Sequence, residues 1–312
     1  MPQMSNNLRG IAAMTVSTLA FTVNDGLVKL VSEAGVPFGQ ILFVRGLAGS
    51  ILVCTLLVAT GAHRALRRLA DRFVVWRTMT EVAATLAYLT ALFRMPIATA
   101  TTLQQAVPLA ATAGAAIFLR EAVGWRRWTA IAIGFLGVVI VVRPGLGGFD
   151  ASSAFVLLAV LFIATRDLIT RVLDPAIPTI LVTAAASVAI TLTGGVISLG
   201  ETWIALSAGN LWMLALASVC LVAGYYSVIL ALRVGEMSVV APFRYVVIVW
   251  ALLFGMLVWH ETPDALTMIG TALIIGTGVY TFYRERYLER QGRPVPPLTM
   301  PVVSAPPIRE GG

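Results

Sequence analysis

Ionisable side chains interrupt several long apolar stretches of this 312-residue chain. A charge in the middle of a bilayer costs at least about 2.5–3.5 kcal/mol, so such groups usually face a partner, a cavity or a ligand. We interpret them as gating, proton-coupling or binding groups. The alternative is that they form buried pairs that fix helix register, or extend toward the lipid headgroups. These residues are Asp25, Arg45, Arg77, Glu81, Asp167 and Arg244.

Matched depths predict which of these charges pair. Asp25 lies six residues before the end of one apolar stretch, and Arg45 lies seven residues after the start of the next, so they should lie at one level near the outer face. The same reasoning pairs Asp167 with Arg244 near the inner face. Arg77 and Glu81 are four residues apart and can pair on one helix face.

A binding site is predicted around Arg244, whose planar guanidinium suits carboxylate or phosphate groups. Gln104 holds the position equivalent to Arg244 in the repeat described below, and Tyr245 or Tyr88 could stack on an apolar part of a ligand. Asn24 adds a polar group. The alternative is that Arg244 only neutralises Asp167, and that the amides and tyrosines only hydrogen-bond neighbouring helices, at about 0.6 kcal/mol each.

Proton coupling is assigned to Glu81 or Asp25, because a desolvated carboxylate can titrate near neutral pH. Arg45, Arg77 and Asp167 are expected to act with them as gating or coupling groups. Lys29 lies nearer the end of its stretch, and we expect it to extend toward the headgroups.

The elements that carry these residues are apolar helices. Hydrophobic residues make up 58% of the chain and charged residues only 12%, whereas soluble domains contain about 25% charged residues. The sequence predicts an all-α, polytopic membrane protein with about ten transmembrane helices. The predicted spans are 10–31, 38–60, 73–94, 97–119, 128–143, 151–173, 178–199, 209–232, 237–258 and 263–284.

Arginine clusters predict the orientation. They fall at 64–72, 120–127 and 284–293, and ten spans place all three on the side of the N-terminus. Because cytoplasmic loops are rich in Lys and Arg, we expect residues 1–9 and the C-terminus in the cytoplasm. Residues 285–312 are rich in proline and are expected to form a disordered cytoplasmic tail.

The two halves of the chain resemble each other. A shift of 140 residues places Glu121 on Glu261, and a shift of 142 places Asp25 on Asp167. The halves, 10–145 and 151–284, would each hold five spans, and an odd number inverts the second copy. This 5+5 inverted-topology repeat is an architecture of secondary transporters.

The closing pattern of each half, IFLREAVGWRRWTAIAIGFLGV at 117–138 and LVWHETPDALTMIGTALIIGTGV at 257–279, resembles the EamA type of the drug/metabolite transporter superfamily. The opening NDGLVK at 24–29, with PFGQ at 37–40 and Arg45-Gly46, is similar to the branch that holds S-adenosylmethionine and riboflavin uptake carriers. The second half has Ser187 where the first has Arg45. The resemblance implies two EamA-like repeats in a bacterial inner membrane and alternating-access transport of a small polar or amphipathic metabolite, by proton coupling or exchange.

Other functions lack their motifs. No Gly-x4-Gly-Lys-Ser/Thr loop, HExxH helix or Gly-x-Ser-x-Gly elbow occurs, so we expect no enzyme, ATP site, metal or cofactor. The predicted partners are a small-molecule substrate and membrane lipids, with no nucleic acid, and the oligomeric state is left open. A channel or membrane scaffold is the alternative function, ahead of a membrane-embedded enzyme.

Overall fold

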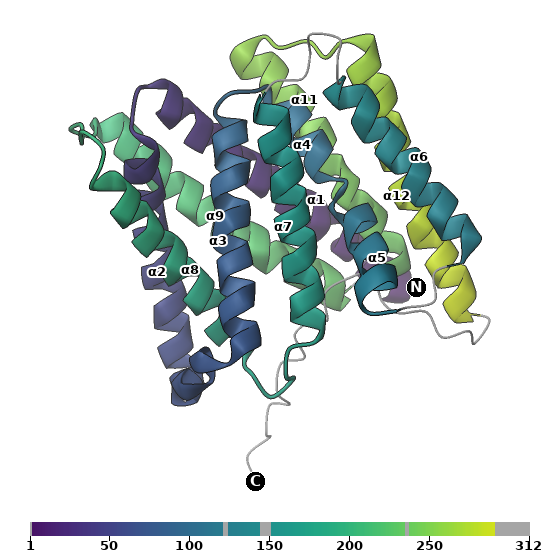
Figure 1. Ribbon diagram of the computed structural model, residues 1–312, viewed down its shortest axis with the longest axis horizontal. Helices are drawn as coiled ribbons and strands as arrows, with labels where there is room; N and C mark the ends of the chain where they lie inside the picture. Colours follow the sequence, from purple (N-terminus) through teal and green to yellow (C-terminus); the bar gives the residue numbers. More distant parts are fainter. Residues whose placement is uncertain (1, 121–123, 144–150, 235–236, 291–312) are drawn as a thin grey trace.

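The protein is a bundle of helices (Figure 1). The computed structural model describes residues 2–120, 124–143, 151–234 and 237–290, and within these ranges it contains helices and no strand. Glu121 and the tail from 291 to 312 lie outside the described residues. The helices are α1 Pro2–Glu33, α2 Phe38–Ala59, η1 Ala62–Ala70, α3 Arg72–Leu92, α4 Ile97–Gln104, α5 Val107–Phe118, α6 Trp125–Val142, α7 Ala151–Arg171, α8 Thr179–Ser198, α9 Ala208–Val234, α10 Met237–Val240, η2 Ala241–Tyr245, α11 Val246–Trp259 and α12 Ala265–Arg290.

The predicted all-helical fold with several membrane-spanning helices is confirmed, while the number of ten spans stays a prediction. Seven helices in the described ranges are long and apolar enough to cross a membrane, and a shorter apolar helix covers Ala265–Thr281. Two boundaries differ from the expectation. Helix α1 already begins at Pro2, and α12 continues to Arg290 where a disordered tail was expected from 285.

Two predicted spans are broken. The span predicted at 97–119 divides into α4 and α5, with Gln105 and Ala106 between them and Pro108 at the start of α5. The span predicted at 237–258 divides into α10, η2 and α11, with Pro242 at the start of η2. Proline has no N–H to donate and clashes with the preceding turn, which explains both interruptions.

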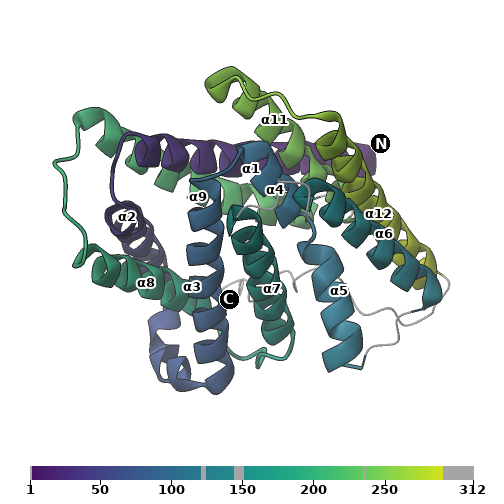
Figure 2. The ribbon, with the colours of Figure 1, turned by 45° about the horizontal axis from the view of Figure 1, so that its top comes forward.

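The most extensive helix contacts join the first half of the chain to the second. Helix α1 packs along α9, α2 along α8, α3 along α7 and α6 along α12, while α4 contacts α11 (Figures 1 and 2). The main buried apolar cluster takes side chains from both halves, including Ile41, Leu92 and Leu103 of the first and Leu214 and Ile274 of the second. The two halves therefore share one core.

Glycines allow the closest of these approaches, between α6 and α12. A Cβ added to Gly137 would lie 2.8 Å from the carbonyl oxygen of Gly270, so neither position leaves room for a side chain. Gly276 of the same helix does not serve this purpose, because nothing lies within 4 Å of where its Cβ would be. Close packing thus depends on which face of α12 a glycine occupies.

Polar contacts tie the connections to the helix ends. The Glu201 carboxylate accepts hydrogen bonds at 2.9 and 3.0 Å from the backbone N–H of Gly39, at the start of α2 where the helix dipole favours an anion. Arg143, after α6, pairs with Asp264, before α12. Hydrogen bonds from Arg143 and Thr267 hold the pKa of Asp264 at about 2.

Candidate functional site

The first polar cluster is centred on Asp25 of α1. The Tyr88 hydroxyl of α3 donates to Asp25 Oδ2 at 2.8 Å, and the Asn24 amide donates to Oδ1 at 2.8 Å. Arg45 of α2 attracts Asp25 electrostatically, but the two side chains make no direct ion pair within the described part of the chain. The prediction that they lie within ion-pair reach therefore stays a prediction.

Two buried polar atoms of this cluster have no hydrogen-bond partner, namely Arg45 Nη1 and Asn24 Oδ1. Leaving such an atom unpaired costs about 1–3 kcal/mol, and more when the group is charged. A guanidinium N–H and an amide oxygen that lack partners beside a carboxylate can receive both the acceptor and the donor groups of a polar solute.

The second cluster joins α3 to α7 through four charged side chains. Arg166 Nη1 lies 2.9 Å from Glu81 Oε1, and Arg166 Nη2 lies 2.7 Å from Asp167 Oδ1. Arg77 Nη2 lies 3.3 Å from Glu81 Oε2, which confirms the predicted pair. All four side chains are between 13% and 21% exposed, so the two positive and two negative charges compensate one another largely away from solvent.

Arg166 is the central cation of this cluster, and it was not among the residues expected from the sequence. Asp167 was expected to pair with Arg244; instead it accepts from Arg166, its neighbour in sequence. Arg244 is exposed and forms no ion pair within the described residues. The repeat could have indicated Arg166, because a shift of 142 residues places Asn24 on it. Asn24 and Arg166 each donate to the aspartate that follows them.

One face of α3 connects the two clusters. Arg77, Glu81 and Tyr88 fall within about 40° of one another around the helix, and Tyr88 lies about 10.5 Å along the axis from Glu81. Tyr225 of α9 interacts electrostatically with Arg45 of the first cluster and with Glu81 of the second. Its side chain is 52% exposed although it stands among these charges. The two clusters thus share one face of α3 and the neighbourhood of Tyr225, and we refer to them together as the polar path.

Gln104, Arg244 and Tyr245 lie at the two helix breaks. Gln104 is the last residue of α4, and the other two belong to η2. Gln104 and Arg244 each stand seven residues after the start of α4 and α10, respectively. The Tyr245 ring approaches Gly278 of α12. Helix ends within a span expose unpaired backbone groups, as at the discontinuous helices of transporter sites.

Lys29 connects the ends of α1, α3 and α11 through a hydrogen bond, an ion pair and a cation–π contact, and we refer to these contacts as the Lys29 closure. It is 4% exposed, and its ammonium donates to the Met95 carbonyl at 2.6 Å. It lies 3.7 Å from Glu261 Oε1 and 4.9 Å from the centre of the Trp259 ring. Trp259 Nε1 in turn donates to the Glu33 carboxylate at 2.7 Å. The expectation that Lys29 extends to the headgroups is wrong, because three helix ends surround it.

The Lys29 closure contains a titratable carboxyl group, that of Glu261, so we expect the stability of the protein to depend on pH. Burial raises the pKa of Glu261, against the opposing effect of Lys29. The pKa of Glu261 is thus higher in the folded protein than its value of about 4.3 in the unfolded chain. The contribution of Glu261 to the free energy of unfolding is therefore fully present below about pH 4.3, and it is lost as pH rises through the folded-state pKa. Glu261→Gln should therefore flatten the decline in thermal stability of detergent-solubilised protein that begins as pH rises above about 4.

Lys29→Met provides the comparison for Glu261→Gln. It leaves the Met95 carbonyl and the partly buried Glu261 without their cation, so it should lower the unfolding temperature, and the double variant should recover part of the loss. Identical pH profiles for wild type and Glu261→Gln would contradict the assignment.

Comparison with known proteins gives a consistent picture. A model of the EamA-like transporter family matches residues 8–143 and again residues 151–283. The chain is 24% identical to the S-adenosylmethionine uptake transporter of Rickettsia prowazekii, over 89% of this chain and 94% of that one. It is 26% identical to the riboflavin transporter of Vibrio cholerae, over 86% and 91%, and 27% identical to the pseudopaline exporter CntI of Pseudomonas aeruginosa, over 85% and 93%.

A solved crystal structure shares the fold. It aligns with 92% of this chain and 99% of its own, with a TM-score of 0.57 and 18% sequence identity. The names of the relatives are those of transporters and an exporter, and not of enzymes, which agrees with the expectation from sequence. The apolar helices and these relatives make the chain a multi-pass membrane protein.

Proposed function

The chain belongs to the EamA-like transporter family, and on that premise we propose that it is a secondary carrier. It moves a small polar or amphipathic metabolite across a bacterial inner membrane by alternating access. The observation that carries the proposal is the polar path through the bundle, where the buried Arg45 Nη1 lacks a partner near Asp25. A substrate with both donor and acceptor groups would supply the missing partners.

The 5+5 inverted repeat, with halves 10–145 and 151–284, supports alternating access. The family model matches once in each half. In such a repeat α1, α2, α3 and α6 of the first half would correspond to α7, α8, α9 and α12 of the second. A two-fold axis would then exchange the α1–α9 pair with the α3–α7 pair. It would map the α2–α8 pair and the α6–α12 pair each onto itself. These four pairs have the most extensive contacts. If each of the two similar halves can adopt the packing of the other, the site would open alternately to the two sides of the membrane.

The breaks in the fourth helix of each half fit the same scheme. Gln104 and Arg244 would stand about 10.5 Å from opposite faces, since each lies seven residues after the start of its span. We assign Gln104, Arg244 and Tyr245 to substrate contacts at the breaks. Tyr88 and Asn24 complete the site beside Asp25, where Tyr88 can also stack on an apolar part of the substrate.

Gating and coupling are assigned to the charged clusters. Asp25 and Glu81 are the candidate proton-coupling acids, because each carboxylate is held inside the bundle by donors from another helix. When Asp25 or Glu81 gains or loses a proton, the charged groups beside it would change their ion-pair partners. These groups are Arg45, Arg77 and Asp167. The names of the relatives, which refer to S-adenosylmethionine, riboflavin and pseudopaline, support a small polar or amphipathic metabolite as the substrate.

Transport in proteoliposomes tests this function. Purified protein should first be screened by thermal shift against amino acids, nucleosides, flavins and S-adenosylmethionine, because a bound ligand stabilises the folded state. A stabilising compound should then show saturable counterflow in reconstituted vesicles. Flux that does not saturate would indicate a channel, and absence of both flux and ligand-dependent stabilisation would contradict the carrier proposal.

Replacing Arg244 by Gln tests the contact at the second break. The side chain is exposed and unpaired within the described residues, so unfolding temperature should stay near that of wild type. Transport should fall by about tenfold or more, the loss expected when a hydrogen bond to a charged group is removed. A variant that transports normally would remove Arg244 from the site.

Both termini are proposed to be cytoplasmic, as the arginine clusters suggest. Reporter fusions after Arg68 and after Arg290 should both give cytoplasmic signals. A periplasmic signal at either position would contradict the ten-span topology.

A further inference from the structure

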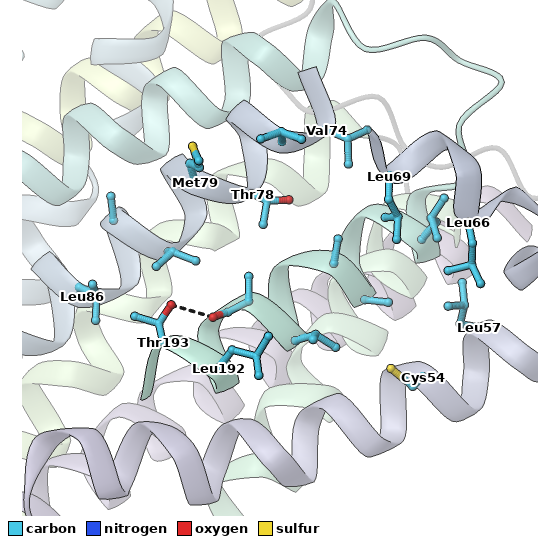
Figure 3. A pocket seen from close by; sticks show the side chains of 18 residues that line it. Cys54, Leu57, Leu66, Leu69, Val74, Thr78, Met79, Leu86, Leu192 and Thr193 are labelled. Carbon is cyan, nitrogen blue, oxygen red and sulfur yellow. Dashed lines mark hydrogen bonds between the residues drawn. The ribbon is translucent and has the colours of Figure 1, made fainter. Parts of the chain in front are cut away.

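An apolar groove of about 710 Å³ lies between α3 and α8, bounded by η1 and the end of α2 (Figure 3). Its walls include Leu57 of α2, Leu66 and Leu69 of η1, and Leu192 of α8. Few polar groups reach it. Thr193, one of them, donates its hydroxyl to the Ala189 carbonyl of its own helix at 2.8 Å, as Figure 3 shows. The groove therefore offers almost nothing to a polar solute.

The groove is separate from the polar path. Val75, Met79 and Leu86 of α3 line it, whereas Arg77 and Glu81 belong to the polar clusters. Met79 is about 200° from Glu81 around the helix, so the two sets lie on opposite faces of α3. Within a bilayer, an apolar groove on the outward face meets lipid tails.

Two arginines without an acidic partner among the described residues lie beside the groove, on η1. Leu66 and Leu69 face it, and the same short helix carries Arg64 and Arg67, both exposed. Arg68 pairs with Asp174 at 3.6 Å, but Arg64 and Arg67 have no acidic partner among the described residues. Arginine binds phosphate through its planar fork, and the proposed topology puts η1 at the cytoplasmic surface, where anionic lipid headgroups lie.

We propose that this groove is a binding site for an anionic phospholipid. One acyl chain lies between α3 and α8, and the phosphate is held by Arg64 and Arg67. The site combines an apolar groove for the tail with an adjacent unneutralised basic group for the head. The proposal requires the membrane orientation given above but not transport activity.

Native mass spectrometry of the full chain in detergent tests the site with phosphatidylglycerol, phosphatidylcholine and inorganic phosphate as probes. We expect phosphatidylglycerol to bind more tightly than phosphatidylcholine, and the double variant Arg64→Gln/Arg67→Gln to weaken it on the order of thirtyfold. The matched control Arg9→Gln/Arg126→Gln removes two exposed charges of the same predicted side and should leave binding within about twofold.

Filling the groove tests the tail position independently. Ala189 lines the groove, and Ala189→Phe should reduce phosphatidylglycerol binding, whereas Val196→Phe, at a 68% exposed position of the same helix, should not. Monodisperse size-exclusion profiles would show that both variants fold. Equal binding of the two lipids, binding of inorganic phosphate as tight as that of phosphatidylglycerol, or full phosphatidylglycerol binding by Ala189→Phe would each overturn the proposal.

Discussion

Replacing Arg166 by Gln is expected to lower the free energy of unfolding by about 3–5 kcal/mol, the usual result of removing one partner from a buried ion pair. Arg166 bridges Glu81 of α3 and Asp167 of α7, and without it Arg77 would be the one cation of this four-residue cluster left beside two carboxylates. The change should appear as a large fall in unfolding temperature of the detergent-solubilised protein, together with loss of transport.

A compensating change distinguishes charge imbalance from a general packing defect. Arg166→Gln/Asp167→Asn leaves the Arg77–Glu81 pair neutral and should recover most of the stability. Arg94→Gln, at an exposed site after α3, is the matched control and should stay within about 0.5 kcal/mol of wild type. If Arg166→Gln and Arg94→Gln unfold at the same temperature, the cluster does not stabilise the bundle.

Replacing Asp25 by Asn is expected to reduce saturable transport by about ten- to a hundredfold, because hydrogen bonds to charged groups contribute about 1.5–3 kcal/mol. The amide cannot accept from both Tyr88 and Asn24 as the carboxylate does, and it removes the countercharge of Arg45. Tyr88→Phe, which removes one of these hydrogen bonds, should have a smaller effect. The measurement is counterflow in proteoliposomes.

The double variant Asp25→Asn/Arg45→Gln separates two roles. If the two charges only neutralise each other, it should restore both stability and transport. If they bind or couple to substrate, as proposed, stability should recover while transport stays low. Asp174→Asn, at an exposed carboxylate paired with Arg68, should transport at the wild-type rate; wild-type transport by Asp25→Asn would remove Asp25 from the mechanism.

The sequence by itself determined the features that depend on composition and on neighbours within one helix. Hydropathy indicated where the apolar helices run, because lipid requires about 20 apolar residues for each crossing. The Arg77–Glu81 pair followed from a spacing of four on one helix. The prolines at 108 and 242 were visible too, and they could have predicted the breaks in α4–α5 and α10–α11.

Only the tertiary structure decided which side chains meet between helices. Depth can be counted from the end of a span, and it predicts that Asp25 and Asp167 lie near opposite faces of the membrane. Depth does not give the rotation of a helix about its axis. Tyr88 reaches Asp25 from 63 positions away, and Glu81 meets Arg166 across 85. Lys29 is buried because the ends of α3 and α11 close around it. Such contacts depend on how amphipathic faces pack, and continuously apolar helices carry little periodic signal of that rotation.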